Sequence, residues 1–528
     1  MCQVDEEYDS LLEQKSLPAV SKKCMKCKEA TAALLIRVGD AFCRVCFKEY
    51  FIHKFRAMLG KNRVIFPKEK ASLDIKQIIF HEFDSTLLNE VLLAVSGGPA
   101  SSCMLAQVQE GLSRDAPKKL RFLPGVIYID EAGVCGQTPE EREKAAVQLE
   151  NIFRMTGFPY HIVPLEQIFT LPESVLESVC SREQVGSSYK AAVDQHIRTE
   201  LIWAHEEPPL EESQDAVAQL SLQASTYKPE HTLALEELFS SLKTLTAKQD
   251  MLNTLRQHLI LHTARIHGYS KVMMGDSCTR LAIKVLTNVS LGRGAALAAD
   301  TAFSDSRYGD VVMLRPMREY SSKEIGFYNR LFEVQSVFIP GLDTKAANKA
   351  SIQRLTESFV VKLQADFPST VSTVYRTSEK LHTACPPQSS TTEPAPKCLL
   401  CLCALDTKIT GKSHHITSQY IYYDASAFRA TLLSKKLSRG PLEEKKHSDA
   451  GCCQGKEQAC RDGGCCSTSR VPAATDLKSL LCYSCRLTIK DLTAVDSLPP
   501  YITSEAEKRQ RRAAMKKEIG EFLLEDDE

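Results

Sequence analysis

The sequence predicts an α/β protein built on a doubly wound parallel sheet, with a cysteine-rich module on each side of the sheet domain. Three observations carry this prediction. Apolar runs of strand length alternate with helical stretches from residue 91 onward. The first run ends in a Ser-Gly-Gly turn, and the second ends in two acidic residues. Eight of the 20 cysteines form four C-x-x-C pairs, two near each end of the chain.

Length and composition limit the classes of protein that fit. The chain has 528 residues, 43% of them hydrophobic and 25% charged, which predicts two to four folded units and excludes global disorder. Lys plus Arg and Asp plus Glu both number 66, so a uniformly basic nucleic-acid binder is excluded, while a local basic face is allowed. No apolar run is long enough to span a membrane, and the acidic N-terminus lacks the apolar region of a signal peptide. We expect a soluble cytoplasmic protein with reduced cysteines.

The first cysteine set follows an expected flexible tail at residues 1–23. Its spacing is C-x2-C-x15-C-x2-C, which is typical of a zinc site in which each pair supplies two thiolates. Unrelated buried thiols or a redox pair are the alternative. We therefore predict a zinc ribbon at residues 24–46, with four ligands: Cys24, Cys27, Cys43 and Cys46.

A basic helix is predicted at residues 47–70, directly after the ribbon. Large apolar residues recur every four positions and define one buried face: Phe47, Phe51, Phe55 and Leu59. Cations on or beyond the other faces are candidates for contacts with RNA phosphates, although a solvated basic face is the alternative. These cations are Lys54, Arg56, Lys61 and Arg63.

The central domain is predicted at residues 91–384. Its strands are expected at 91–95, 125–130, within 156–165, and at 271–276, with helices at 140–156 and 246–267. Such alternation favours a doubly wound sheet that binds ligands at the carboxyl ends of its strands. The polar, Pro-containing segment 205–231 is expected to be an exposed insertion, and 385–397 is expected to be a linker.

The second cysteine set lies in a module predicted at residues 398–490, with zinc bound by Cys398, Cys401, Cys482 and Cys485. Eighty residues separate Cys401 from Cys482, and loop length alone costs little entropy. Segment 434–475 is expected to be a disordered loop. Other cysteines compete as ligands, or merely reflect a biased, exposed segment: Cys403, Cys452, Cys453, Cys460, Cys465 and Cys466. Residues 491–528 are expected to form a helix and an acidic tail.

The stretch VLLAVSGGPASS holds a strand, a glycine turn and a helix start. Ser96, Gly97 and Gly98 allow a phosphate to approach the backbone closely, and Pro99 suits the first position of a helix whose N–H groups face an anion. Ser101 follows in the first turn. These residues predict a phosphate cradle, and a tight turn without a ligand is the alternative.

The stretch also resembles the PP-loop of the N-type ATP pyrophosphatases, whose pattern is S-G-G-x-D-S. The cysteine ribbon, basic helix, SGG loop, IDE strand end, MGDSCTRLAIKVLTN and LRPMREYSSKEIGFYNRLF occur in the order found in tRNA 2-thiolation enzymes of this family. Against that pattern, residues 71–90 form an extra segment that we expect to be looped out as an insertion.

Departures from the family pattern fall on its catalytic positions. Ala100 replaces the loop aspartate, and Thr279 and Arg280 replace an acidic pair that serves Mg²⁺. Leu314 stands where a cysteine precedes the K-P segment, and TLRQHLILHTARIHG lacks the family's C-x-x-C. Cys278 lies nearby, but at another motif position. The degenerate loop leaves ATP binding open, and we assign no catalytic residue.

The resemblance therefore implies a non-catalytic subunit that forms a heterodimer with an active homologue. The complex would make 2-thiouridine (mcm5s2U) at the wobble position of tRNAs for Lys, Glu and Gln. The sulfur would come from a thiocarboxylated ubiquitin-like modifier. Two alternatives stay open: a zinc-ribbon scaffold or RNA-binding protein without nucleotide chemistry, and an active tRNA-adenylating sulfurtransferase.

Overall fold

The computed structural model of the protein describes residues 23–36, 40–65, 90–113, 119–177, 228–378, 380, 382–383, 396–405, 421–422, 477–492 and 497–520. Several predicted segments lie wholly or almost wholly outside these residues: the tail at 1–23, the insertions at 71–90 and 205–231, the linker at 385–397, the loop at 434–475 and the acidic tail after residue 520.

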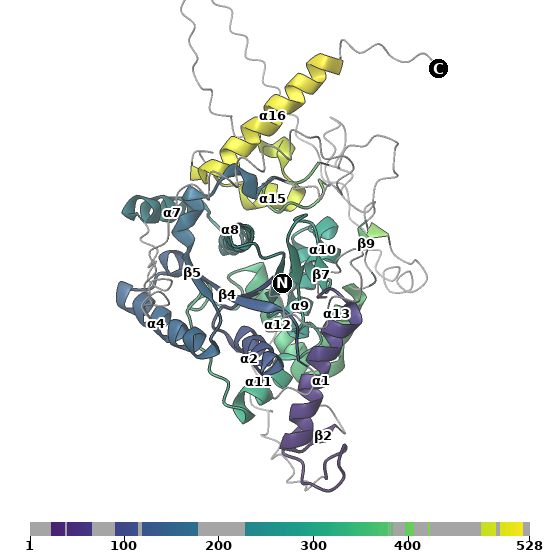
Figure 1. Ribbon diagram of the computed structural model, residues 1–528. Helices are drawn as coiled ribbons and strands as arrows, with labels where there is room; N and C mark the ends of the chain where they lie inside the picture. The colour runs from purple at the N-terminus through teal and green to yellow at the C-terminus, as the bar shows by residue number, and fades with distance from the viewer. Residues whose placement is uncertain are drawn as a thin grey trace, which may run out of the picture.

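A six-stranded sheet in the order β5-β4-β3-β6-β8-β7 forms the centre of the protein (Figure 1). All neighbouring strands are parallel except β7, which pairs antiparallel with β8. The sheet confirms the predicted fold class. Its strands are β3 (Glu90–Ala94), β4 (Leu123–Asp130), β5 (Tyr160–Pro164), β6 (Lys271–Met274), β7 (Ser304–Asp305) and β8 (Val312–Leu314).

Strand order reverses at β3. The chain adds β4 and β5 on one side of β3 and then returns to add β6 and β8 on the other side. In such a sheet, the carboxyl ends of the two strands at the reversal frame a crevice where ligands bind. The Ser-Gly-Gly turn after β3 and the loop after β6 therefore meet at this switch crevice.

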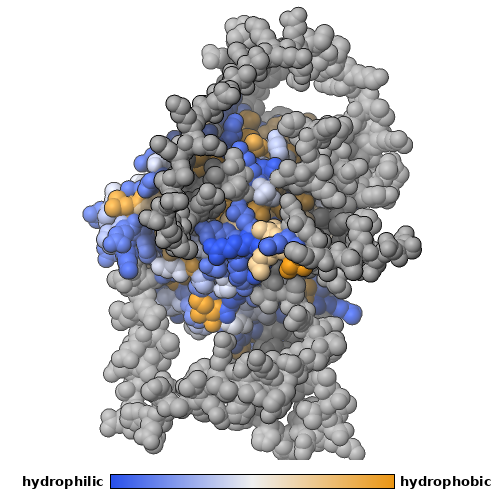
Figure 2. Space-filling view, turned by 90° about the horizontal axis from the view of Figure 1, so that it is seen from above, coloured by the Kyte–Doolittle hydropathy of each residue, from blue (hydrophilic) through white to orange (hydrophobic). Residues whose placement is uncertain are grey.

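Helices cover both faces of the sheet (Figure 1). They are α1 (Arg44–Asn62), α2 (Pro99–Leu112), α3 (Ala132–Cys135), α4 (Pro139–Thr156), α7 (Pro229–Ser241), α8 (Leu245–Ile266), α9 (Cys278–Ser290), α10 (Gly294–Thr301), α11 (Ser322–Leu331), α12 (Ile352–Asp366), α13 (Pro368–Ser378), α15 (Tyr483–Thr488) and α16 (Pro500–Gly520). The predicted helices at 140–156 and 246–267 correspond to α4 and α8. No helix within the described residues is long and apolar enough to cross a membrane. Seen from above, the described part of the surface is mostly hydrophilic, with smaller hydrophobic patches (Figure 2).

Side chains of the central strands alternate between two cores. Val91 and Leu93 of β3 pack into a core shared with α1, α2, α4 and α11, whereas Leu92 faces α7, α8 and the C-terminal module. This alternation follows from the two-residue period of a strand. The predicted apolar face of α1 is fully buried in the first core. A smaller third core joins α9, α12 and α13.

The two cysteine modules lie at opposite ends of the molecule (Figure 1). The N-terminal module contains the short hairpin β1 (Leu34–Leu35) and β2 (Ala41–Phe42) and the start of α1. The C-terminal module contains the turn at residues 398–402, α15 and the start of α16, and it packs into the same core as α8. Both modules are therefore joined to the sheet domain through buried side chains.

Candidate metal centres and the phosphate-loop site

The first four-cysteine cluster joins a tight turn to the start of a helix. Lys28 follows Cys27 with a left-handed backbone (φ 62°), and its N–H donates to the carbonyl of Cys24 at 2.8 Å. Cys43 is the N-cap of α1, and its Sγ accepts a hydrogen bond from the N–H of Cys46 at 3.5 Å. The turn and the helix each supply one pair, and the four Sγ atoms lie within 4.8 Å of one another.

The second cluster is constructed in the same way. Leu402 follows Cys401 with φ 56°, and its N–H donates to the carbonyl of Cys398 at 3.1 Å. Cys482 is the N-cap of α15, its N–H donates to the Sγ of Cys398 at 3.3 Å, and Cys485 lies in the first helical turn. These four Sγ atoms also lie within 4.8 Å of one another. Both predicted ligand sets are therefore brought together.

The sulfur separations suit one soft metal ion per cluster. A tetrahedral ion with metal–sulfur bonds of about 2.3 Å holds its sulfur atoms roughly 3.8 Å apart. The Sγ atoms of Cys27 and Cys43 are 4.0 Å apart, and those of Cys401 and Cys482 are 3.7 Å apart. A disulfide needs about 2.05 Å. In each cluster three of the cysteines are buried and one is half-buried, so a bound ion would be shielded from water.

The thiols of each cluster perturb one another. Burial would raise the pKa of Cys24, but backbone N–H groups of Cys43 and two neighbours lower it to about 6. Burial and contacts with the other thiols raise the pKa of Cys46 to about 12. Hydrogen bonds from neighbouring thiols, Cys398 first, hold the pKa of Cys401 well below its usual range. In each cluster one thiol is therefore more acidic than a free cysteine, and the thiolate is the form that binds a metal ion.

Cys403 lies beside the second cluster but outside its ligand set. Its Sγ accepts a hydrogen bond from Arg307 at 2.7 Å, and the same guanidinium pairs with Asp300 and Asp305. The other competing cysteines lie outside the described residues: Cys452, Cys453, Cys460, Cys465 and Cys466.

A buried histidine connects the second cluster to the sheet domain. His258 of α8 is 1% exposed, with Nδ1 2.6 Å from the hydroxyl of Tyr501 and Nε2 2.8 Å from the carbonyl of Leu400. Because a carbonyl only accepts, Nε2 carries the proton and Nδ1 accepts from Tyr501. Burial lowers the pKa of His258 to about 4, so the ring is neutral at pH 7. One side chain thereby joins α8, α16 and the cysteine turn.

The glycine loop connects β3 to α2 at the switch crevice. Gly97 has φ +77°, a conformation that favours glycine, and Gly98 is the N-cap of α2 before Pro99. The Ser101 hydroxyl accepts from the N–H of Ser96 at 3.2 Å and donates to the carbonyl of Gly98 at 3.1 Å. The four predicted nucleotide-site residues therefore form one loop that is closed by its own hydrogen bonds.

Protein encloses this loop on two sides. A Cβ at Gly275, just after β6, would lie 2.8 Å from the Cα of Ser101, so glycine permits close packing there. On the other side, the N–H of Val337 donates to the carbonyl of Gly97 at 2.9 Å. Gly97 is buried as a result, while Ser96 stays exposed. Access to the loop is therefore from the Ser96 side.

The residues at the position of the family's acidic pair are engaged elsewhere. The Thr279 hydroxyl accepts from the N–H of Ser322 at 3.1 Å and donates to Gln364 at 3.3 Å. Arg280 is exposed and lies 3.7 Å from a carboxylate oxygen of Glu357. Neither position offers a carboxylate to a divalent cation.

The carboxylate that remains after β6 has an internal counter-ion. The Arg315 guanidinium lies 3.4 Å from Asp276 and 3.7 Å from Asp305, and it also donates to the carbonyls of Ala299 and Ala302 at 3.1 and 2.9 Å. Arg315 is 4% exposed. An arginine side chain of the chain itself thus supplies positive charge at this edge of the crevice.

The acidic residues that end β4 are also paired. Arg142 contacts Asp130 and, through two hydrogen bonds of 2.8 and 3.1 Å, the fully buried Glu166. Glu131 pairs with Arg256 of α8. Through these ion pairs, the acidic residues hold α4 and α8 against the carboxyl end of β4.

The four cations predicted to contact RNA have different surroundings. Lys54 is 13% exposed, and its Nζ lies 2.9 Å from the carboxylate of Glu324. Arg56 is half-buried, and its Nε has no hydrogen-bond partner among the described residues. Lys61 and Arg63 are exposed at the end of α1. The cations therefore do not form one uniform exposed face.

Sequence reasoning missed the residue that engages Lys54. The pattern Ser321-x-x-Glu324 is visible in the sequence as a capping box, and the structure contains that capping box at the start of α11. Its pairing with Lys54, 270 positions earlier, has no sequence signal.

Fold and site together define an α/β protein with a glycine turn at the switch crevice of its sheet and two four-cysteine clusters. The family model "cytoplasmic tRNA 2-thiolation protein 2" matches residues 351–487. The chain is 60% identical over 539 residues to the Danio rerio protein of that name, covering 100% of both chains. It is 48% identical over 541 residues to the Homo sapiens protein, covering 100% of this chain and 98% of the relative.

The chain belongs to the family of cytoplasmic tRNA 2-thiolation protein 2. Among solved structures, "U34-tRNA thiolase NcsA from Methanococcus maripaludis" with its 4Fe–4S cluster is similar at 14% identity and a TM-score of 0.41. That similarity covers 68% of this chain and 88% of the other.

Proposed function

We propose that this chain acts in cytoplasmic tRNA 2-thiolation as the non-catalytic subunit of a heterodimer with a catalytic homologue. Family membership supports the general role. The proposal extends to 2-thiouridine (mcm5s2U) at the wobble position of tRNAs for Lys, Glu and Gln. A thiocarboxylated ubiquitin-like modifier would deliver sulfur through the complex.

The observation that carries this proposal is the chemistry of the switch crevice. The loop keeps the backbone of a phosphate cradle, yet Ala100 offers no carboxylate and Thr279 is hydrogen-bonded to Gln364. Arg315 adds positive charge beside Asp276, where a Mg²⁺ site would need carboxylate oxygens. A loop with these neighbours supports the fold better than it supports adenylation.

Zinc is the metal proposed for both clusters. Four thiolates near a tetrahedral spacing form a structural zinc set, and such sites stabilise folded modules directly. A cluster of several iron and sulfide atoms would hold its cysteine sulfurs farther apart than a single ion does. The 4.0 and 3.7 Å sulfur separations favour the single ion.

The proposed RNA contacts rest on the end of α1. Lys61 and Arg63 are exposed and have no ion-pair partner in the described part of the chain. Phosphate contacts of this kind position an RNA without reading its bases. Arg56 stays in the proposed set, whereas the ion pair of Lys54 supports a structural role for that residue.

Reconstitution of tRNA thiolation from separate subunits tests the proposed function. This chain alone should give no 2-thiouridine, and adding it to the catalytic homologue should raise the yield well above that of the homologue alone. The two subunits should also copurify. ATP-dependent thiolation by this chain alone would refute the proposal in favour of an active sulfurtransferase. Copurification without any effect on thiolation would favour the scaffold alternative.

A further inference from the structure

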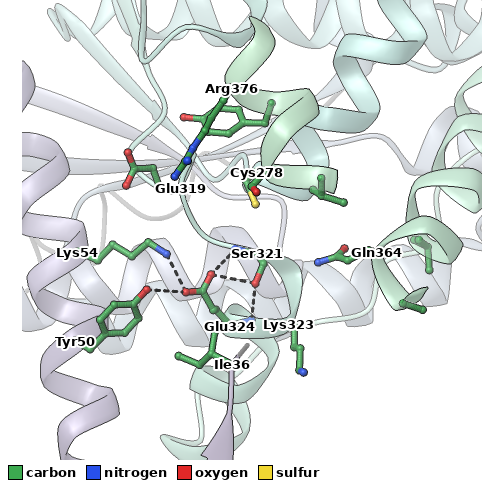
Figure 3. A pocket seen from close by; sticks show the side chains of 15 residues that line it. Ile36, Tyr50, Lys54, Cys278, Glu319, Ser321, Lys323, Glu324, Gln364 and Arg376 are labelled. Carbon is green, nitrogen blue, oxygen red and sulfur yellow. Dashed lines mark hydrogen bonds and ion pairs between the residues drawn. The ribbon is translucent and has the colours of Figure 1, made fainter. Parts of the chain in front are cut away.

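A pocket of about 520 Å³ lies beyond the carboxyl ends of β6 and β8, between α1, the start of α11, α9, and the α12–α13 pair (Figure 3). None of its lining residues belongs to the glycine loop. Its volume lies within the roughly 300–1,000 Å³ that small-molecule sites occupy. Its position agrees with the rule that open α/β sheets bind ligands beyond the carboxyl ends of their strands.

One wall of the pocket is fixed by internal bonds. Lys54 and the hydroxyl of Tyr50 both contact Oε1 of Glu324, at 2.9 and 3.1 Å, and Ser321 binds the other carboxylate oxygen through its N–H and its hydroxyl (Figure 3). Burial would raise the pKa of Glu324, but Lys54 and Ser321 lower it below its usual range. This wall is charge-neutral and needs no ligand.

The opposite side carries charges without counter-ions. Arg376 of α13 and Glu319 line the pocket, and neither has an ion-pair partner among the described residues. Lys323 also lines the pocket, but it lies at the other end, beside Glu324, and its Nζ is 5.7 Å from the centroid of the Phe327 ring (Figure 3). All three are exposed. Arg376 is thus the cation on this side of the pocket, and its guanidinium can bind an anionic group of a ligand through charge-assisted hydrogen bonds (Figure 3).

A neutral donor also points into the cavity. The Oε1 of Gln364 accepts a hydrogen bond from Thr279, which leaves its amide NH₂ available to the pocket (Figure 3). Aromatic faces are not available. The ring of Tyr50 stacks on Phe42, and Arg318 lies 4.9 Å from the centroid of the Tyr375 ring. An aromatic ring bound in this pocket would therefore be recognised by hydrogen bonds to its polar edge.

We propose that this pocket binds a single nucleoside monophosphate unit. Its phosphate would lie against Arg376, and a polar group of its base would meet the amide of Gln364. The choice of an unpaired RNA nucleotide as the source, over a free nucleotide, rests on the proposed function. The pocket itself is argued from its own geometry.

Binding by the full chain tests the pocket. The probes are a short fluorescent oligouridylate, the same strand annealed to oligoadenylate, and uridine monophosphate as a competitor. Arg376→Gln should weaken binding of the single strand and of the competitor about tenfold or more, because each charge-assisted bond to phosphate is strong. Binding of the duplex should not change. Arg121→Gln, an exposed arginine ahead of β4, is the matched control and should bind as the wild type does.

Three results would overturn part or all of this inference. Unchanged single-strand and monophosphate binding by Arg376→Gln would refute the pocket. If Arg376→Gln weakened the binding of uridine monophosphate but not of the single strand, the ligand would not be an RNA nucleotide. Competition by a phosphoserine peptide but not by uridine monophosphate would refute the nucleotide. Thiolation by the reconstituted complex separates the two proposals. If the chain supports thiolation but binding does not depend on Arg376, only the pocket is refuted. If binding depends on Arg376 but the chain has no effect on thiolation, only the proposed function is refuted.

Discussion

Replacing Lys54 with methionine should loosen the attachment of α1 to α11. Glu324 is 2% exposed and would lose its counter-ion, while keeping hydrogen bonds from Tyr50 and Ser321. Removing one partner of a fully buried ion pair costs about 3–5 kcal/mol. Lys54 retains 13% exposure and the carboxylate retains donors, so we expect the low end, about 3 kcal/mol. Lys54→Met with Glu324→Gln should recover most of this loss, because no charge is then buried alone.

Amide hydrogen exchange of α1 and α11 measures this local stability directly, because protection reports the free energy of local opening. Lys61→Met on the same helix is the control and should leave exchange unchanged. Binding of tRNA across a salt series gives the second readout: Lys61→Met should lower the slope by roughly 0.7–0.9, and Lys54→Met should not. A Lys54→Met variant with normal exchange protection and a lowered salt slope would show that Lys54 contacts RNA and would refute this reasoning.

Four further experiments test other parts of the structure. Tyr501→Phe should lower the free energy of unfolding by about 1–3 kcal/mol, because Nδ1 of His258 would lose its hydrogen-bond donor. Helix α16 should then become sensitive to proteolysis, and resistance equal to that of the wild type would contradict this. Because burial lowers the pKa of His258 to about 4 from an unfolded value near 6.5, this side chain should lower the free energy of unfolding by about 3 kcal/mol as pH drops across that window. In denaturant titrations His258→Gln should remove that share and leave the share of His161, whose pKa burial also lowers to about 4. Gly275→Ala should lower the free energy of unfolding by about 1–3 kcal/mol, because the new Cβ would clash with the first turn of α2. Gly326→Ala is the control and should not destabilise the protein, since no atom lies within 4 Å of its new Cβ. Equal denaturation midpoints for the two variants would contradict the close packing at Gly275. Elemental analysis should find two zinc ions per chain and one in Cys24→Ser, and loss of both ions would refute two independent sites.

The sequence predicted elements with strong local patterns. The four-residue recurrence of Phe47 and Phe51 identified the buried face of α1, and the apolar run ending at Val95 identified the central strand. The C-x-x-C pairs identified both clusters, because each pair fixes two ligands on one short segment. The short strands β7 and β8 were missed, since two or three residues carry no periodicity.

The surroundings of individual side chains were harder to predict. From the sequence, Lys54 is expected to be a solvated cation on a basic helix. In the structure it forms an ion pair with Glu324, which lies on a helix 270 positions later. Likewise, the sequence did not predict α15, whose N-cap is Cys482. In both clusters the second cysteine pair lies at the N-terminus of a helix. Long-range pairing is decided by the packing of the sheet and its helices, and that information is spread over the whole chain.

The central claim is that the glycine loop of this chain supports structure and does no chemistry. Gly98→Ala tests it, because a Cβ there lies no closer than 3.7 Å to the nearest atom, the Ser96 hydroxyl oxygen, so the fold tolerates it while close phosphate approach is blocked. The measurement is the rate of tRNA 2-thiolation by the heterodimer, with the corresponding glycine of the catalytic homologue replaced in parallel. Gly98→Ala should leave the rate at the wild-type value, and the replacement in the homologue should abolish it. Loss of thiolation with Gly98→Ala in a complex that still assembles and binds tRNA would contradict the account.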